Sequence, residues 1–240
     1  MMIDIEHRPS DSPYIERVWS SGTAPSRMHS IANSNWEFLV WEALDGRVHA
    51  SIRGPETAPS AVEVSGFTNA FGIVFAHGAY LPHLPVPRLV DTAVAAPHVS
   101  ARQIELRGET WELPTFDTAE DFVNRLARDG VLLRDRLVSE VTAGDDATDL
   151  GARSVQRRVV TATGLTQGVI RQIERARQAA VLLGEGIPAL DVVHRLGFYD
   201  QPHLARSLTR FMGRTATELQ RPGDTEPVSL LYKTDDRLPR

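Results

Sequence analysis

The chain has 240 residues, of which 42% are hydrophobic and 24% are charged, and such proportions are ordinary for a soluble globular protein. It contains no cysteine, which excludes disulfide scaffolds, thiolate metal sites and cysteine nucleophiles. No apolar run approaches the ~18 residues of a membrane span, and the first residues carry no apolar signal-peptide core. We therefore expect a cytoplasmic protein without a membrane partner.

The net charge of −5 hides an uneven distribution. Residues 1–149 carry 12 Lys and Arg against 22 Asp and Glu, whereas residues 150–221 carry 11 against 5. A basic segment joined to an acidic one is typical of a polyanion-binding module attached to a part with another task. A solvated helix face would give the same excess, so the charge alone leaves both interpretations open.

Short strands and turns dominate the sequence from about Trp36 to Pro114. Residues 38–41 form a short apolar run, residues 48–53 alternate between apolar and polar, and residues 71–75 are apolar again. Prolines interrupt the stretch that follows, and a final hairpin is expected around Gly108. This pattern predicts a small antiparallel sheet or barrel. We expect a β-rich regulatory, sensor or dimerisation domain over residues 1–115.

Helical patterns begin at about residue 116. Asp117 and Thr118 are residue types that cap helices, and Phe122 and Leu126 lie one turn apart before a glycine. The further expected helices cover residues 134–143, 152–162, 168–183, 188–196 and 200–211. We expect a helical domain over residues 116–221, followed by a polar tail over residues 222–240 to which we assign no role.

An internal repeat relates two of these helices. Residues 154–166 align with residues 203–215, and in both copies apolar residues recur at i and i+4, which predicts one buried stripe per helix. The matching pairs include Val155 with Leu204, Val159 with Leu208, and Gly164 with Gly213. The opposite faces carry Arg, Gln, Ser and Thr, the side chains that contact bases and phosphates in a DNA major groove. An ordinary helical bundle with a charged surface is the alternative interpretation.

The second copy shows the order of residues that a helix-turn-helix requires. Pro188 stands near the first helical position, Gly197 permits the turn, and Asp200 can cap the second helix. The pattern therefore favours DNA binding over a purely structural bundle.

Residues 145–221 resemble the double helix-turn-helix domain of the AraC/XylS family of transcription regulators. The similarity lies in the run Gly197-Phe198-Tyr199-Asp200-Gln201-Pro202-His203-Leu204, in Arg210-Phe211-Met212-Gly213, in Arg157-Arg158 with Thr163-Gly164-Leu165, and in Ile173-Glu174-Arg175-Ala176-Arg177. The chain departs from the family pattern at Pro202, Leu204, Ala216 and Leu219-Gln220. The resemblance implies two helix-turn-helix units joined by a helix, so that one chain reads two neighbouring turns of a duplex.

Nine side chains on the outer faces are candidates for DNA contacts. We expect the base-reading residues to be Arg153, Gln156, Arg157, Gln201, His203 and Arg206, and the phosphate-binding residues to be Arg158, Ser207 and Arg210. His203 has a second interpretation, as a helix-surface residue that only packs.

The β-rich half resembles, more weakly, the sensor domains attached to some AraC-type regulators, which implies a cupin-like barrel that binds an effector, mediates dimerisation or does both. Aromatic side chains could line the mouth of such a barrel, and the candidates are Trp36, Phe38, Trp41, Phe75 and Tyr80. The same rings would equally serve as the core of the domain.

His77 and His83 lack the further convergent ligands that a metal needs. No nucleophile elbow, phosphate loop or dinucleotide fingerprint is present, so we expect no metal, no cofactor and no catalysis.

Together these patterns predict an α+β chain, with an N-terminal antiparallel cupin-like β-barrel and a C-terminal all-α domain of two helix-turn-helix units joined by a helix. The expected function is a sequence-specific DNA-binding transcription regulator controlled by a small-molecule effector. The expected partners are double-stranded DNA, RNA polymerase and a second copy of the chain. The alternative is a cupin-like enzyme or ligand-binding protein whose helical half serves assembly.

Overall fold

The computed structural model describes residues 5–22, 27–63, 67–96, 99–100, 102–145, 150–221 and 228–229. The strands are β1 (Ile5–Pro9), β2 (Ile15–Ser21), β3 (Arg27–Ser30), β4 (Glu37–Ala43), β5 (Val48–Arg53), β6 (Ser60–Glu63), β7 (Phe67–Phe75), β8 (Ala79–Tyr80), β9 (Ala93–Ala95), β10 (Gln103–Leu106), β11 (Glu109–Glu112), β12 (Leu133–Arg134) and β13 (Val228–Ser229). The helices are the 3₁₀ turn η1 (Val86–Arg88), α1 (Ala119–Arg128), α2 (Arg136–Thr142), α3 (Ala152–Thr163), α4 (Gln167–Gly184), α5 (Ala189–Leu196), α6 (Gln201–Met212) and α7 (Ala216–Gln220). None of the helices within these ranges is long and apolar enough to cross a membrane.

The largest sheet has six strands in the order β1-β2-β7-β4-β5-β9, and all neighbouring strands in it are antiparallel. Three smaller sheets pair β10 with β11, β12 with β8, and β13 with β3 and β6. Among the described residues the strands therefore form four separate sheets and no closed barrel. The expected α+β class is confirmed, whereas the expected cupin-like barrel is not.

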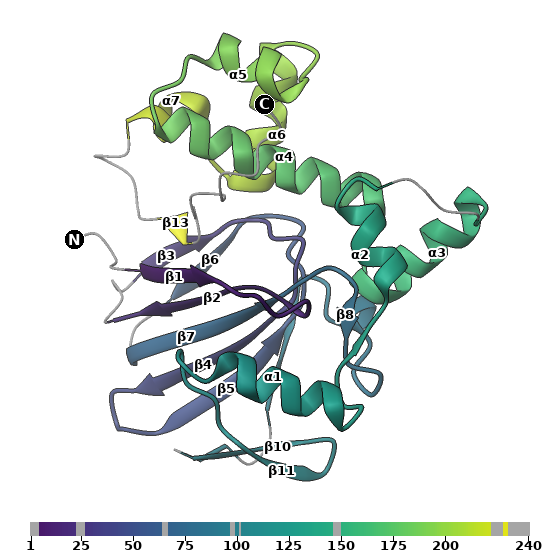
Figure 1. Ribbon diagram of the computed structural model, residues 1–240. Coiled ribbons are helices and arrows are strands. Elements are labelled where there is room, and N and C mark those ends of the chain that lie inside the picture. Colours follow the sequence, from purple (N-terminus) through teal and green to yellow (C-terminus); the bar gives the residue numbers. More distant parts are fainter. Residues whose placement is uncertain are drawn as a thin grey trace.

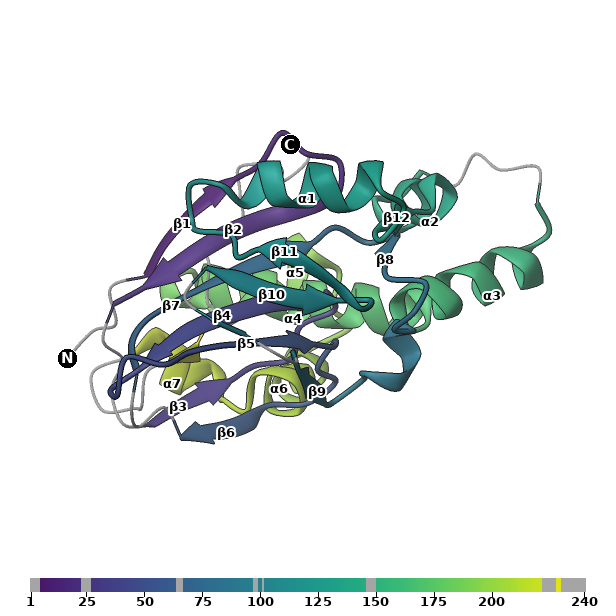
Figure 2. The ribbon, with the colours of Figure 1, turned by 90° about the horizontal axis from the view of Figure 1, so that it is seen from below.

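The two faces of the six-stranded sheet bury different side chains because side chains alternate along a strand. Phe38 and Val40 of β4 lie on the face that forms the main core of the sheet. Leu39 and Trp41 lie on the other face and pack beside Trp19. Figure 2 shows α1 and the β10–β11 hairpin in front of the sheet, on the side opposite α4, α5 and α6.

Helix α1 belongs to the core of the sheet rather than to the other helices. Phe122 is 1% exposed and its ring centroid lies 5.6 Å from that of Phe38. Arg8 of β1 forms a bidentate ion pair with Glu120, with nitrogen–oxygen distances of 2.6 and 2.8 Å. The core of the sheet consequently extends beyond residue 115, as far as Leu132. We call residues 5–134 the sheet part and residues 136–221 the helical part.

The helical part is arranged around α4, the longest helix. Figure 1 shows α2 and α3 at one end of α4 and α5, α6 and α7 at the other, with the sheet part on one side. All six expected helices are present, and their ends lie within about two residues of the expected positions. Of the expected tail, only residues 228–229 lie within the described residues, where they pair in parallel with β3.

Candidate nucleic-acid interface

Helix α3 is amphipathic. Val155, Val159 and Ala162 form its buried stripe, with exposed fractions of 8%, 0% and 5%. Gly164 ends the helix with a φ of +74°, a left-handed conformation that glycine adopts at little cost. Because the buried stripe fixes the rotation of the helix, Arg153, Gln156 and Arg157 face solvent, and all three are exposed.

Helix α6 repeats this construction. Leu204 and Leu208, the counterparts of Val155 and Val159, are 1% and 0% exposed. The side chain of Asp200 accepts a hydrogen bond of 2.7 Å from the backbone N–H of His203, which caps the first turn. Gly213, the counterpart of Gly164, ends the helix at a φ of +65°. The predicted repeat therefore produces two helices of the same build.

Helix α4 connects the two copies. Its stripe of Ile170, Ile173, Ala176 and Ala180 is buried, as the spacing predicts, and it packs within a core that includes residues of α3 and α6. At its start, the hydroxyl of Thr166 accepts a hydrogen bond of 3.3 Å from the N–H of Val169. In Figures 1 and 2, α3 projects away from the body of the molecule. The two amphipathic helices, α3 and α6, are thus attached at opposite ends of helix α4.

Most of the predicted DNA-contacting side chains lie at the surface of these two helices. The exposed ones are Arg153, Gln156, Arg157, Arg158, Gln201, Arg206 and Arg210, and the partly buried ones are His203 and Ser207. Seven of the nine candidates are therefore accessible to a ligand as large as a duplex.

Three candidates have intramolecular partners that the sequence did not indicate. The guanidinium of Arg210 lies 4.7 Å from the ring centroid of its neighbour Phe211. Arg158 pairs with Asp135, the N-cap of α2, at 2.8 Å, so it joins α3 to the preceding helix. The Nδ1 of His203 accepts a hydrogen bond of 3.3 Å from the N–H of Tyr199, and its ring meets that of Phe198 edge-on. These contacts give Arg158 and His203 a packing role whatever they do with DNA.

The turn between α5 and α6 contains two aromatic residues, Phe198 and Tyr199, that were not among the predicted site residues. Phe198 is buried, and the guanidinium of Arg175 on α4 lies 4.6 Å from its ring centroid. Tyr199 is 91% exposed. The neighbouring Gly197 has a φ of +65° and lets the chain turn between the buried ring and the exposed one. An aromatic pair after a turn glycine was visible in the sequence, but which of the two rings is buried depends on tertiary packing.

The five aromatic candidates for an effector pocket are not gathered in one place. Trp36 and Phe75 stack with ring centroids 3.8 Å apart, and both belong with Phe38 to the buried core of the sheet. Trp41 lies on the opposite face of the sheet, and Tyr80 packs at the edge of the core. The described positions favour a core role for three of these rings, and an effector site stays a prediction.

A chain of polar contacts joins the sheet part to α4. The hydroxyl of Ser34 donates to Glu174 at 2.6 Å and lies 3.0 Å from the Nε2 of His77. Since the hydroxyl proton is given to Glu174, the Nε2 of His77 is the donor to Ser34. Arg177, only 4% exposed, donates to the carbonyl oxygen of Ala32 and to Asn33 Oδ1, both at 3.3 Å.

These contacts perturb two pKa values. Burial lowers the pKa of His77, against the opposing charge of Glu174, so the imidazole is neutral at pH 7. Burial raises the pKa of Glu174, but the charge of Arg177 and the hydrogen bond from Ser34 outweigh it and lower that pKa overall. The carboxylate is therefore ionised, and the two parts are joined through a charged and hydrogen-bonded contact.

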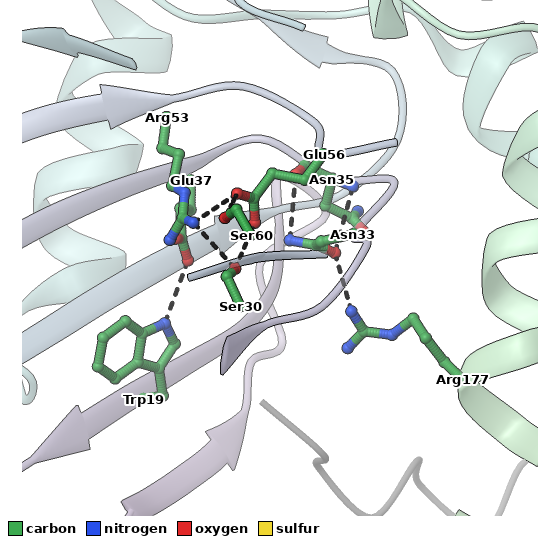
Figure 3. Close-up of polar contacts among 9 residues, drawn as sticks. All are labelled: Trp19, Ser30, Asn33, Asn35, Glu37, Arg53, Glu56, Ser60 and Arg177. Carbon is green, nitrogen blue, oxygen red and sulfur yellow. Dashed lines mark hydrogen bonds and ion pairs between the residues drawn. The ribbon is translucent and has the colours of Figure 1, made fainter. Parts of the chain in front are cut away.

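A second polar cluster lies next to the contact with Arg177. Figure 3 shows Arg53 between Glu37 and Glu56, with Ser30 and Trp19 completing the cluster. Arg53 pairs with Glu56 and donates to Ser30 at 2.9 Å, and the indole of Trp19 donates to Glu37 at 3.3 Å. Glu37 is only 2% exposed, so this cluster satisfies a buried carboxylate.

The sequence matches no model of a known protein family, no characterised protein and no solved structure. Within the described ranges, no group of three or more His, Cys, Asp or Glu side chains could hold a metal ion. The leading feature of the chain is a pair of repeated, arginine-bearing helices, α3 and α6, at opposite ends of the connecting helix α4.

Proposed function

We propose that this protein is a sequence-specific DNA-binding transcription regulator in which α3 and α6 are the two reading helices. The observation that carries the proposal is the repeat itself: two helices of equal build, buried on equivalent stripes and attached to the two ends of α4, each expose arginine and glutamine. In this interpretation α5 and α6 form one helix-turn-helix, and α2 and α3 form the other.

The exposed side chains suit the major groove. Arginine forms bidentate hydrogen bonds with guanine, and glutamine forms them with adenine. Each reading helix carries both an arginine and a glutamine at its surface. Arg157 and Arg206 occupy equivalent positions of the repeat and are both exposed. The basic balance of residues 150–221 would supply the attraction to phosphates that every DNA-binding protein needs.

We assign the regulatory role to the sheet part. This assignment follows the resemblance to AraC/XylS regulators. The hydrogen bonds of Ser34 and Ala32 with Glu174 and Arg177 of α4 support it, because they connect the sheet part directly to the helical part. Control by a small-molecule effector, a homodimeric state and contact with RNA polymerase belong to the same proposal. The buried rings of Trp36, Phe38 and Phe75 do not support the expected aromatic pocket as the effector site.

The proposal is tested by selecting duplexes from a random-sequence library with the full chain and then measuring binding to the selected duplex by fluorescence anisotropy. The titration is made at about 50 and 200 mM salt with excess unrelated competitor DNA. Binding that survives competitor is expected for the full chain. Arg206→Ala should weaken binding by roughly 1–3 kcal/mol and relax selectivity at one base position.

Arg128→Ala is the matched control, because Arg128 is an exposed arginine on α1 in the sheet part. It should leave the affinity unchanged. Enrichment of no common sequence, or equal losses from Arg206→Ala on all duplexes, would mean that α6 does not read bases.

A further inference from the structure

The sheet part contacts the ends of both reading helices at equivalent positions of the repeat. A Cβ placed on Gly164, at the end of α3, would lie 2.6 Å from Val90 and 3.1 Å from Pro87. A Cβ placed on Gly213, at the end of α6, would lie 3.0 Å from Pro59. The distance at Gly164 is shorter than real Cβ contacts and the distance at Gly213 is at their lower limit, so both helix ends lie directly against the sheet part.

The other glycines in the described helical part do not share this environment. Gly144, Gly151, Gly186 and Gly197 have nothing within 4 Å of an added Cβ, and Gly168 and Gly184 meet only atoms of the helical part. Contact with the sheet part is therefore specific to the two glycines that the repeat relates.

The segments that make these contacts form one hydrogen-bonded unit. We call residues 31–33, 54–59 and 85–92 the brace. The carboxylate of Asp91 accepts from the N–H and the hydroxyl of Thr57, at 2.6 and 2.7 Å, and Asn33 exchanges two backbone hydrogen bonds with Glu56, at 2.9 and 2.8 Å. Figure 3 shows Asn33 between Glu56 and Arg177 of α4. Backbone hydrogen bonds from Gly54 to Thr92 and from Asp91 to Pro55, at 3.0 and 2.8 Å, join the same two segments, so loss of the Thr57–Asp91 bonds weakens the link between the segment at α3 and the segment at α6.

The brace also enters the core of the helical part. Ile31 and Ala32 are both 0% exposed and belong to the core cluster of the helices. The N–H of Ala32 donates to the carbonyl oxygen of Phe211, in the last turn of α6, at 2.8 Å. The brace therefore touches α3, α4 and α6, the three helices that determine how the reading faces are placed.

We propose that the brace fixes the distance and orientation between α3 and α6 and thereby sets the spacing of the two DNA half-sites that the protein accepts. This rests on the proposed function, in which α3 and α6 are the reading helices. A helix joined only to α4 can still rotate about that contact, whereas an additional contact with the brace at its C-terminal end restricts this rotation. One base pair changes the half-site position by ~3.4 Å and ~34°, so a rigid pair of helices discriminates between neighbouring spacings.

The first test needs no DNA. The chain has no cysteine, so nitroxide labels can be placed by Thr161→Cys and Thr209→Cys, at exposed positions of α3 and α6, and the distance between them measured by double electron–electron resonance. Asp91→Gly removes the carboxylate and accepts the φ of +58° that Asp91 has. The distance distribution should be narrow in the parent chain and clearly broader with Asp91→Gly.

Asp45→Gly is the matched control, because Asp45 also accepts a hydrogen bond from a backbone N–H, in the turn between β4 and β5. It should leave the distribution unchanged. Gly54→Ala gives a second test should Asp91→Gly fail to fold, because a Cβ on Gly54 would overlap the carbonyl oxygen of Leu89 and would force the same two segments apart. An unchanged distribution in the brace variant would overturn the proposal.

The second test measures anisotropy on the selected duplex and on duplexes with one base pair inserted or removed between the half-sites. The parent chain should lose at least ~10-fold in affinity on the altered duplexes, and the brace variant less than ~3-fold. Equal losses in both proteins would overturn the role in spacing. Failure of the parent to bind any duplex selectively would overturn the proposed function instead, while the label distances would still decide whether the brace holds the helices.

Discussion

Replacing Arg177 by methionine tests the contact between the sheet part and α4. Arg177 is 4% exposed, and its Nη1 donates to the backbone oxygen of Ala32 and to Asn33 Oδ1. Arg177→Met keeps an apolar stem of similar length but leaves these buried acceptors without the charged donor. An orphaned buried polar group costs about 1–3 kcal/mol, and the loss of the positive charge beside Glu174 adds to this.

We therefore expect Arg177→Met to lower the free energy of unfolding by about 3 kcal/mol. With a urea dependence of about 2–3 kcal/mol/M, the midpoint should fall by about 1 M. Unfolding can be followed in both parts at once. The four tryptophans, Trp19, Trp36, Trp41 and Trp111, lie in the sheet part and report on it by fluorescence, whereas far-ultraviolet circular dichroism is dominated by the helices.

Because Ile31 and Ala32 are buried in the core of the helices, both signals should move to lower urea together. Arg195→Met, at an exposed arginine of α5, is the matched control and should change the free energy by less than about 1 kcal/mol. A midpoint for Arg177→Met equal to that of the parent chain would refute the reasoning, because a buried charged contact cannot be removed without cost.

Three further predictions concern stability. Hydrogen bonds from Arg8 lower the pKa of Glu120 from 4.5 to about 2, so the ion pair stabilises the fold fully above pH 4.5 and this stabilisation is lost as the pH falls towards 2. Since the pair is about 30% exposed, Glu120→Gln should lower the free energy of unfolding in urea by roughly 1–2 kcal/mol at pH 7. A loss of the same size at pH 2 would count against the ion pair. Burial lowers the pKa of His77, so below pH 6.5 the unfolded chain takes up a proton that the folded chain does not, and the stability of the fold should decrease as the pH drops. His77→Asn should therefore flatten the dependence of the melting temperature on pH between about 6.5 and 5. An unaltered slope would contradict this. Leu208→Ala, at a fully buried position of α6, should lower the free energy of unfolding by about 3–5 kcal/mol. The control Leu190→Ala, at a position that is 53% exposed, should lower it by less than about 1 kcal/mol. Equal decreases for the two variants in calorimetry would show that Leu208 is not packed in the core.

The helices could be predicted from the sequence because their signals are local. Apolar residues at i and i+4 gave the buried stripes of α3 and α6, and Gly164, Asp200 and Gly213 marked their ends. The repeat added information that a single helix lacks, since each copy predicts the buried face of the other. The exposure of Arg157 and Arg206 follows from these local patterns alone.

The tertiary arrangement could not be predicted in the same way. An amphipathic stripe such as Phe122 and Leu126 shows that α1 is buried on one side, but not that it packs on the sheet rather than on the other helices. Partners distant in sequence, such as Arg158 with Asp135 or Ser34 with Glu174, leave no local pattern. The alternation along β4 could have separated Trp41 from Phe38, because an odd spacing within a strand puts two side chains on opposite faces.

The central claim is that α3 and α6 each read one half-site of a single duplex. The most direct measurement is hydroxyl-radical footprinting of the selected duplex with the full chain, with Arg157→Ala and with Arg206→Ala. The account predicts two protected tracts on one face of the duplex, about one helical turn apart, with each variant losing a different tract. A single tract, or the loss of the same tract in both variants, would contradict it.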